Sequence, residues 1–338
     1  MTIYLLRRLF LLGTVLLGLS IFAFSLGYLF PGDPLQNFSG LRYLDDSTRE
    51  QLTLAYRLDG SYLQQYLAFI QRLWHGDWGL SLASQQPLLT EIRQVLPATL
   101  ELTSYALLVS FFVGIPLGIL AAIKPDGVIG KAISAIAITG YSLPIFWWGL
   151  LLIMVFAVGL GWFPSGGRLG VLYEIPPQTG FMLIDILLSD VSYRQAALQD
   201  ALRHLLLPTL ALATFPTTVM IRFVRDAMLD VWEQSYIKTA KAKGLSRLQV
   251  LYRHGLRNAL LPVIRQIGLQ FSTLITLAML TEVIFSWPGI GRWLIDSIYQ
   301  RNFPAIQAGL MIISVLVITV NMLTEILHTF FNPLARKR

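Results

Sequence analysis

The residues best suited to chemistry in this chain are five ionisable side chains that fall within apolar stretches. They are Glu101, His204, Glu282, Glu325 and His328. An ionisable residue inside a membrane span is costly to bury and is a candidate for a proton or ion relay. Each of the five lies within about two helical turns, roughly 11 Å, of the end of its stretch. This placement favours an interfacial position and predicts no relay at the midplane of a membrane.

The sequence lacks the patterns that three other kinds of chemistry require. It contains no cysteine, which excludes disulfides, thiolate metal sites and cysteine nucleophiles. The phosphate-binding pattern GxxxxGK[ST] is missing as well, because GVIGK at 127–131 has the wrong spacing and is followed by alanine. We therefore predict no catalytic residue, no cofactor and no metal site, and a chain that is not an enzyme.

The composition indicates which elements must hold these residues. Apolar residues make up 55% of the chain and charged residues 13%, whereas about a quarter of a typical soluble protein is charged. Apolar runs of roughly 20 residues, long enough to cross a bilayer, occur at six places. They are 9–30, 99–123, 133–160, 204–221, 266–287 and 306–332. We therefore predict an all-α integral membrane protein with six transmembrane helices in the lipid bilayer.

The segments between these runs predict three parts. Residues 1–30 are expected to form a retained anchor helix, because the apolar run is too long for a signal peptide. Residues 31–98 are expected to form a small ordered periplasmic insertion, since a breaker cluster, PGDP, precedes helix-like and aromatic stretches. Residues 99–338 are expected to form a core of five transmembrane helices, with a basic hairpin at about 226–262.

Lysine and arginine are concentrated in alternate connecting segments. The segments 1–8, 124–132, 222–265 and 333–338 hold 16 of them in 67 residues, and the other segments hold 10 in 129 residues. Basic residues favour the cytoplasmic side of a membrane protein. We therefore expect both termini in the cytoplasm, and we attribute the net charge of +7 to topology rather than to nucleic-acid binding.

The most basic passage, YIKTAKAKGLSRLQVLYRHGLRNALLPVI at 236–264, carries the signals of a helical hairpin. A helical pattern over 226–243 ends at Gly244, which fits a left-handed position at a helix C-terminus. Ser246 and Gln249 have the spacing of a capping box, so a second helix is expected to begin there.

Apolar residues predict how the hairpin holds its shape. Leu245 and Val250 are spaced as a hydrophobic staple, and Pro262 is expected to end the second helix. A candidate apolar stripe consists of Leu248, Leu251, Tyr252, Leu256 and Leu260. Three interpretations compete: a loop whose cations only set topology, a basic helix that binds anionic lipid, and a docking element for a separate cytoplasmic protein. The third interpretation accounts for the caps as well as the charge.

In these residues the chain resembles the permease subunits of ABC transporters, specifically those of the dipeptide/oligopeptide importer family. KTAKAKG stands where the family has its cytoplasmic coupling motif, and Lys238, Thr239 and Ala240 depart from the general Glu-Ala-Ala pattern. The peptide branch is further matched by Gly244, Leu245, Ser246, Arg253, His254, Leu256, Arg257, Asn258, Ala259, Leu260, Leu261 and Pro262. The resemblance covers nearly the whole chain, including WHGDWGLS and TEVIFSWPGIGRWL, and it is strongest to the Sap-type branch, named for sensitivity to antimicrobial peptides.

The resemblance implies a permease of the bacterial inner membrane with cytoplasmic coupling helices. Its implied partners are a second permease subunit, two ATPase subunits that hydrolyse ATP, and a periplasmic solute-binding protein. The residues expected to couple to the ATPase are Tyr236, Lys238, Thr239, Ala240, Ala242, Gly244, Leu245 and Ser246. Pro144 and Glu282 are weaker candidates for the translocation path.

The cargo implied by the resemblance is peptides, including cationic antimicrobial peptides, or polyamines such as putrescine. The external segments hold 12 acidic and 10 basic residues, a slight bias that suits a cationic cargo. Two other functions remain open from the sequence. One is an ion-driven secondary carrier that acts without an ATPase, and the other is a membrane anchor that transports nothing.

Overall fold

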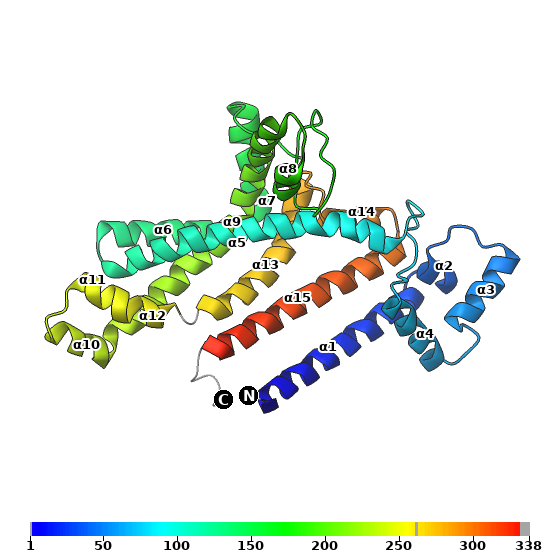
Figure 1. Ribbon diagram of the computed structural model, residues 1–338, viewed down its shortest axis with the longest axis horizontal. Helices are drawn as coiled ribbons and strands as arrows, with labels where there is room; N and C mark the ends of the chain where they lie inside the picture. The colour runs from blue at the N-terminus through cyan, green and yellow to red at the C-terminus, as the bar shows by residue number, and fades with distance from the viewer. Residues whose placement is uncertain (1, 261–262, 332–338) are drawn as a thin grey trace. The chain divides into compact units, whose positions relative to one another are not determined.

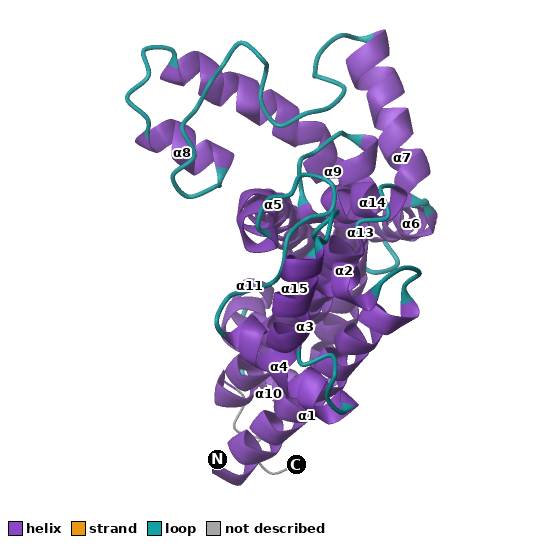
Figure 2. Ribbon diagram, turned by 90° about the vertical axis from the view of Figure 1, so that its right-hand side faces the viewer, coloured by secondary structure: helices purple, strands orange, loops and turns teal. Residues whose placement is uncertain are grey.

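A computed structural model describes residues 2–260 and 263–331, and their regular secondary structure is helical (Figures 1 and 2). The chain divides into two compact units. Unit 1 comprises Met1–Thr99 and Pro288–Thr319, and unit 2 comprises Leu100–Trp287 and Val320–Arg338. The helices α5 (Leu88–Ile123) and α15 (Phe303–Phe331) contribute residues to both units.

Unit 1 is built around the N-terminal helix and the small helices that follow it. These are α1 (Thr2–Leu29), α2 (Pro34–Ser39), α3 (Asp46–Tyr56), α4 (Tyr62–Trp74) and α14 (Ile290–Tyr299), with the start of α5 and of α15. Within PGDP, the Asp33 carboxylate accepts a hydrogen bond from Leu35 N at 2.9 Å and so begins α2. Ser61 and Gln64 form a capping box that begins α4.

The aromatic residues of segment 31–98 pack together with residues of α1 in one core of unit 1. Phe24 of α1, Leu35, Phe38 and Tyr56 are buried together, and Phe24 stacks on Phe38 with ring centroids 5.6 Å apart. The C-terminal end of segment 31–98 is nevertheless part of a long helix, because α5 begins at Leu88, eleven residues before the predicted apolar run.

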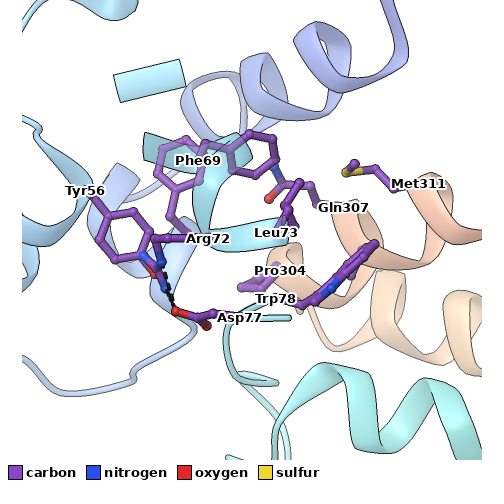
Figure 3. Close-up of a pocket in the computed structure, with 11 residues that line it drawn as sticks. Tyr56, Phe69, Arg72, Leu73, Asp77, Trp78, Pro304, Gln307 and Met311 are labelled. Carbon is purple, nitrogen blue, oxygen red and sulfur yellow. Dashed lines mark hydrogen bonds and ion pairs between the residues drawn. The ribbon is translucent and has the colours of Figure 1, made fainter. Parts of the chain in front are cut away.

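Beside this core, Arg72 of α4 lies over the Tyr56 ring, with its guanidinium carbon 3.5 Å from the ring centroid. Its Nε donates to Asp77 Oδ2 at 2.9 Å, as the dashed lines in Figure 3 mark. Burial lowers the pKa of Arg72, and the Asp77 carboxylate opposes that change. The adjoining cavity, bordered by Pro304 and Met311, has a volume of about 20 Å³, which is room for roughly one water molecule.

Unit 2 is organised around α9 (Arg194–Glu233), the longest helix in the described part of the chain. Its other elements are α6 (Val128–Ser142), α7 (Ile145–Leu152), the π-helix η1 (Ile153–Gly159), α8 (Met182–Leu188), α10 (Ser235–Ala242), α11 (Arg247–Val250), the π-helix η2 (Leu251–Gly255), α12 (Leu256–Ala259) and α13 (Val263–Ile284), with parts of α5 and α15. A Cβ atom on Gly114 of α5 would lie 2.7 Å from Met220 Cβ of α9. The absence of a side chain at Gly114 therefore lets α5 and α9 approach closely.

The described residues include five helices long and apolar enough to cross a membrane, or up to six if one bent pair counts as a single span. The five are found in Phe10–Leu29, Leu88–Ile123, Arg194–Glu233, Gln266–Ile284 and Phe303–Leu327. Helix α9 extends well beyond the predicted run 204–221, and its two internal prolines do not end it. Neighbouring groups in a helix bundle compensate for the hydrogen bonds that such prolines remove.

The run predicted as one span at 133–160 falls on the bent pair, in which Val128–Ser142 and Ile145–Gly159 meet at an angle of 104°. Pro144 disfavours helical geometry at the preceding residue, and Leu143 is extended with φ −77° and ψ 123°. Helix α6 therefore ends at Ser142, and Pro144 becomes the N-cap of α7. Pro144 therefore lies at the break between two helices and not inside one.

Candidate functional site

The hairpin begins with a break that the sequence pattern did not predict. A single helix was expected over 226–243, but α9 ends at Glu233 and Gln234 is extended, with ψ 146°. The Gln234 carbonyl then accepts hydrogen bonds from Ile237 N at 3.1 Å and Lys238 N at 3.3 Å. These bonds begin a new helix, α10, so the first limb of the hairpin is the eight residues Ser235–Ala242.

Helix α10 has one buried face and one exposed face. Ile237 and Ala240, three residues apart, are buried and pack with Val250 of the second limb. Tyr236, Lys238 and Thr239 are exposed. Among the predicted coupling residues, Ala240 therefore belongs to the core of the hairpin rather than to its free surface.

The turn confirms the predicted role of Gly244 in backbone geometry. Gly244 has φ +83°, a conformation that costs a residue with a side chain roughly 1–2 kcal/mol. Leu245 N donates to Ala240 O at 3.4 Å, which is the outer hydrogen bond of a Schellman motif. Apart from its two chain neighbours, no described residue has an atom within 4 Å of the position that a Cβ on Gly244 would occupy. Backbone conformation, and not space within this chain, therefore requires glycine there.

The predicted capping box is also present at the start of the second limb. Gln249 N donates to Ser246 Oγ at 3.3 Å, and Ser246 N donates to Gln249 Oε1 at 2.9 Å. Leu245 and Val250 pack in the same small cluster, as the predicted staple requires. The turn thus satisfies its free backbone groups with its own residues.

The second limb is the continuous run α11, η2 and α12, which ends at Ala259. The predicted apolar stripe divides in this limb: Leu251, Leu256 and Leu260 pack on α9 and α13 beside Met228, whereas Tyr252 is exposed. The side chain of Leu248, and those of His254, Arg257 and the residues Leu261 and Pro262, lie outside the described residues. Most of the described stripe therefore fixes the hairpin to its own unit.

The two limbs also meet directly, because Asn258 Nδ2 donates to Tyr236 Oη at 3.2 Å. The exposed surface that results, named here the hairpin face, consists of Tyr236, Lys238, Thr239, Ala242, Lys243, Gly244 and Ser246. No acidic residue occurs between Glu233 and Glu282 in the sequence. The hairpin face is therefore basic and held in one shape, which suits the docking of an acidic or polar protein surface.

The two weaker candidates do not belong to the hairpin. Pro144 is at the bend between α6 and α7, and Glu282 is fully buried near the end of α13 that is remote from the hairpin. Nineteen residues separate Glu282 from the start of α13 at Val263, which is about 28 Å of helix. No geometry of the described residues assigns either residue to a translocation path.

A buried ion pair in unit 2 is a structural feature that could not be read from the sequence. Arg168 Nε donates to Glu101 Oε2 at 2.9 Å, Leu183 N donates to Glu101 Oε1 at 3.2 Å, and Arg168 Nη2 donates to Gly180 O at 2.6 Å. Glu101 is only 1% exposed. This carboxylate is neutralised within unit 2 and joins α5 to the loop before α8.

The same loop has a second anchor at Asp185 of α8. Burial alone would raise the pKa of Asp185, but hydrogen bonds from the Thr179 hydroxyl and from backbone N–H groups, including those of Thr179 and Gly180, outweigh it and lower the pKa. Of the other ionisable candidates, His204 Nδ1 lies 3.2 Å from Asp200 Oδ2, and the side chain of His328 lies outside the described residues.

Comparison with known proteins was made on the sequence and on the fold. Residues 114–337 match the family described as binding-protein-dependent transport system inner membrane component. Three relatives are similar over their full length. The di/tripeptide transport system permease protein DppB of Pseudomonas aeruginosa is 45% identical, and the match covers 98% of this chain and 97% of the relative. The peptide transport system permease protein SapB of Salmonella typhimurium and the putrescine export system permease protein SapB of Escherichia coli K12 are each 42% identical, and each match covers 100% of this chain and 98% of the relative.

Among solved structures, an inward-facing form of the MetNI methionine ABC transporter is similar in fold. The TM-score is 0.51 at 18% identity, and the match covers 70% of this chain and 93% of the other. At that identity the likeness concerns the fold alone.

Proposed function

This chain belongs to the binding-protein-dependent transport system inner membrane components, and on that premise we propose that its Gly244 hairpin docks on an ATPase subunit and powers peptide transport. Its full-length relatives are permease subunits of peptide ABC transporters. The coupling site is the hairpin face: Tyr236, Lys238, Thr239, Ala242, Lys243, Gly244 and Ser246, supported from beneath by Ala240 and Leu245.

The observation that carries this proposal is that contacts within this chain fix the shape of the hairpin, while its outer face is exposed. The Schellman bond, the capping box and the Asn258–Tyr236 bond fix its shape within this chain. A preformed surface loses little conformational entropy on docking. ATP-driven closure of a bound ATPase therefore moves the hairpin as a rigid body. The closure shifts the permease between two conformations only as far as the contacts between ATPase and hairpin differ in those conformations.

The proposed assembly contains this permease, a second permease, two ATPase subunits and a periplasmic solute-binding protein. The concentration of Lys and Arg in alternate segments favours cytoplasmic termini and a cytoplasmic hairpin. Segment 31–98 would then face the periplasm, where the solute-binding protein approaches. An ion-driven carrier is less favoured, since the buried Glu101 carboxylate is already paired with Arg168 and offers no free proton site.

For the cargo we propose small peptides. DppB of Pseudomonas aeruginosa and SapB of Salmonella typhimurium are named as peptide permeases, and SapB of Escherichia coli K12 is named for putrescine export. Full-length identity is 45% to a di/tripeptide permease and 42% to both SapB proteins, so peptides are shared by the two branches. Putrescine is the second candidate and is tested beside them.

The experiment measures uptake of labelled dialanine by proteoliposomes that hold the whole complex. ATP is either supplied or omitted on the side of the membrane where the ATPase subunits lie. We expect uptake of labelled dialanine that requires ATP, and an ATPase subunit that co-purifies with the permease. ATP-independent uptake driven by an ion gradient would refute the proposal. ATP-dependent uptake of putrescine without dialanine would refute the peptide assignment while retaining the coupling.

A further inference from the structure

Helix α4 exposes a row of large apolar side chains along its length. Four of them recur every three or four residues and so share one face of the helix. They are named here the α4 stripe: Leu63, Leu67, Ile70 and Trp74. Leu63, Leu67 and Trp74 are 67%, 55% and 89% exposed. A continuous apolar surface of this kind marks contact with another protein or with a membrane.

The preceding helix, α3, has a different surface, although it belongs to the same segment of the chain. The exposed residues of α3 include Asp46, Arg49 and Glu50. The one charged residue of α4, Arg72, is turned toward the Tyr56 ring and away from the α4 stripe. Because charges are costly to remove from water and apolar side chains are not, α3 is suited to water and the outer face of α4 to an apolar medium.

The neighbour of α4 in unit 1 is a helix long and apolar enough to cross a membrane. The apolar stretch of α1 is Phe10–Leu29, which has 20 residues and a length of about 30 Å, the thickness of the hydrocarbon core of a bilayer. Arg7 and Arg8 precede this stretch and mark its other end. Leu29 therefore marks the level at which α1 leaves the hydrocarbon.

Helix α4 lies beside the C-terminal part of α1 (Figure 1) and contacts it well inside that stretch. The centroids of the Phe69 and Phe24 rings are 5.6 Å apart, and Tyr66 Oη is 2.7 Å from Ser20 Oγ. Phe24 and Ser20 precede Leu29 by five and nine residues, which is about 8 and 13 Å of helix. The face of α4 that packs on α1 therefore reaches the depth of the acyl chains.

A polar group at that depth needs a partner within the protein, and the buried amide of α4 has its partners. Gln65 is 7% exposed, and its Nε2 donates to Leu58 O at 3.0 Å and to Gly60 O at 2.9 Å. Its Oε1 accepts a hydrogen bond from the Tyr28 hydroxyl of α1. The capping box satisfies N–H groups of the first turn in the same way. Helix α4 thus meets the requirement for a helix in contact with lipid.

We propose that α4 is embedded in the membrane surface and that the α4 stripe binds the acyl chains of the leaflet in which α1 ends. The helix has 13 residues and a length of about 20 Å, too short to cross the hydrocarbon. Its first and last residues, Tyr62 and Trp74, are both exposed, and such aromatic residues favour the boundary between lipid and water. Segment 31–98 is then divided, with α3 in water and α4 in lipid.

The test uses spin labels attached to single cysteines, since the chain contains no cysteine of its own. Leu63→Cys and Leu67→Cys place a label on the α4 stripe. Leu54→Cys is the matched control, because Leu54 is a leucine of α3 that is 68% exposed and lies one turn from Glu50. All three positions are exposed, so the substitutions remove no core contact.

The full chain is placed in nanodiscs of phosphatidylethanolamine and phosphatidylglycerol, together with the subunits that co-purify with it. A preparation with the cysteine-free wild-type chain reports any label on those subunits. Relaxation of each label by oxygen, which concentrates in lipid, is compared with relaxation by a water-soluble nickel chelate. We expect oxygen to relax the labels at positions 63 and 67 while the chelate has little effect on them. The label at position 54 should be relaxed strongly by the chelate.

Two results would overturn the proposal. Access of the chelate to the labels at 63 and 67 would place the α4 stripe in water. If a solute-binding protein then blocked that access, the stripe would be a docking surface for a water-soluble protein. Protection of both labels from oxygen and from the chelate would show that a neighbouring protein subunit covers the stripe. None of these results concerns the Gly244 hairpin, so this inference and the proposed coupling stand or fail separately.

Discussion

Replacing Gly244 with valine tests the coupling proposal at the single residue where the turn needs glycine. At φ +83° a residue with a Cβ costs roughly 1–2 kcal/mol, which changes the equilibrium of the turn by a factor of about 5–30. Apart from the chain neighbours, a Cβ there lies within 4 Å of no atom in the described part of the chain. Valine therefore strains the turn without meeting any described residue other than its chain neighbours.

Gly76 provides a matched control in unit 1. It has φ +81°, it is exposed, and a Cβ there would also meet nothing within 4 Å. It also occupies the same position in a Schellman motif, since Asp77 N donates to Arg72 O at 3.0 Å. Gly76→Val and Gly244→Val should therefore cost similar amounts of local stability.

The assay is the amount of dialanine taken up per ATP hydrolysed by proteoliposomes that hold the whole complex. We expect Gly244→Val to reduce that ratio by at least about fivefold, the lower bound of the strain estimate, while Gly76→Val leaves it near the wild-type value. Both variants should reach the membrane in similar amounts. Equal ratios for the two variants would refute the argument that the Gly244 turn couples ATP hydrolysis to transport.

Three further predictions concern the hairpin and the core of unit 2. Ser246→Ala removes one half of the capping box and should destabilise the second limb by about 0.5–2 kcal/mol, seen as faster hydrogen exchange of its amides. Glu101→Gln leaves the Arg168 guanidinium without its buried carboxylate and should lower stability by about 3–5 kcal/mol, measured as a lower Tm in detergent, with recovery when Arg168→Met is added. Gly268→Ala would bring a Cβ against the Thr324 hydroxyl and should cost about 1–3 kcal/mol by overpacking; Thr324→Ala should restore most of the lost Tm.

The parts of the hairpin that could be predicted from sequence are those set by neighbours in the chain. The Gly244 turn and the Ser246–Gln249 capping box depend on backbone geometry and on contacts three to five residues apart. Such signals are readable without knowledge of the fold. The role of these residues in coupling stays a prediction, because it depends on a second protein.

The features that could not be predicted depend on contacts between distant segments. The pair Glu101–Arg168 spans 67 residues, and no spacing rule relates a carboxylate in an apolar run to an arginine in a later loop. The break at Gln234 likewise has no proline or glycine to signal it. Hydropathy located the spans but did not predict how long the helices are. The ends of α9, for example, are polar and lie beyond any apolar window.

The bend between α6 and α7 decides on which side of the membrane the hairpin lies. If the bent pair crosses the membrane, four crossings precede Ser235, and an even number returns the chain to the side of its N-terminus. If the pair enters and leaves on one side, the number is three, and the hairpin and the N-terminus lie in different compartments. An ATPase in the cytoplasm can reach the hairpin of a chain with a cytoplasmic N-terminus only in the even case. The few residues around Pro144 thus decide whether the number of crossings before the hairpin is even or odd, although they are not part of the hairpin.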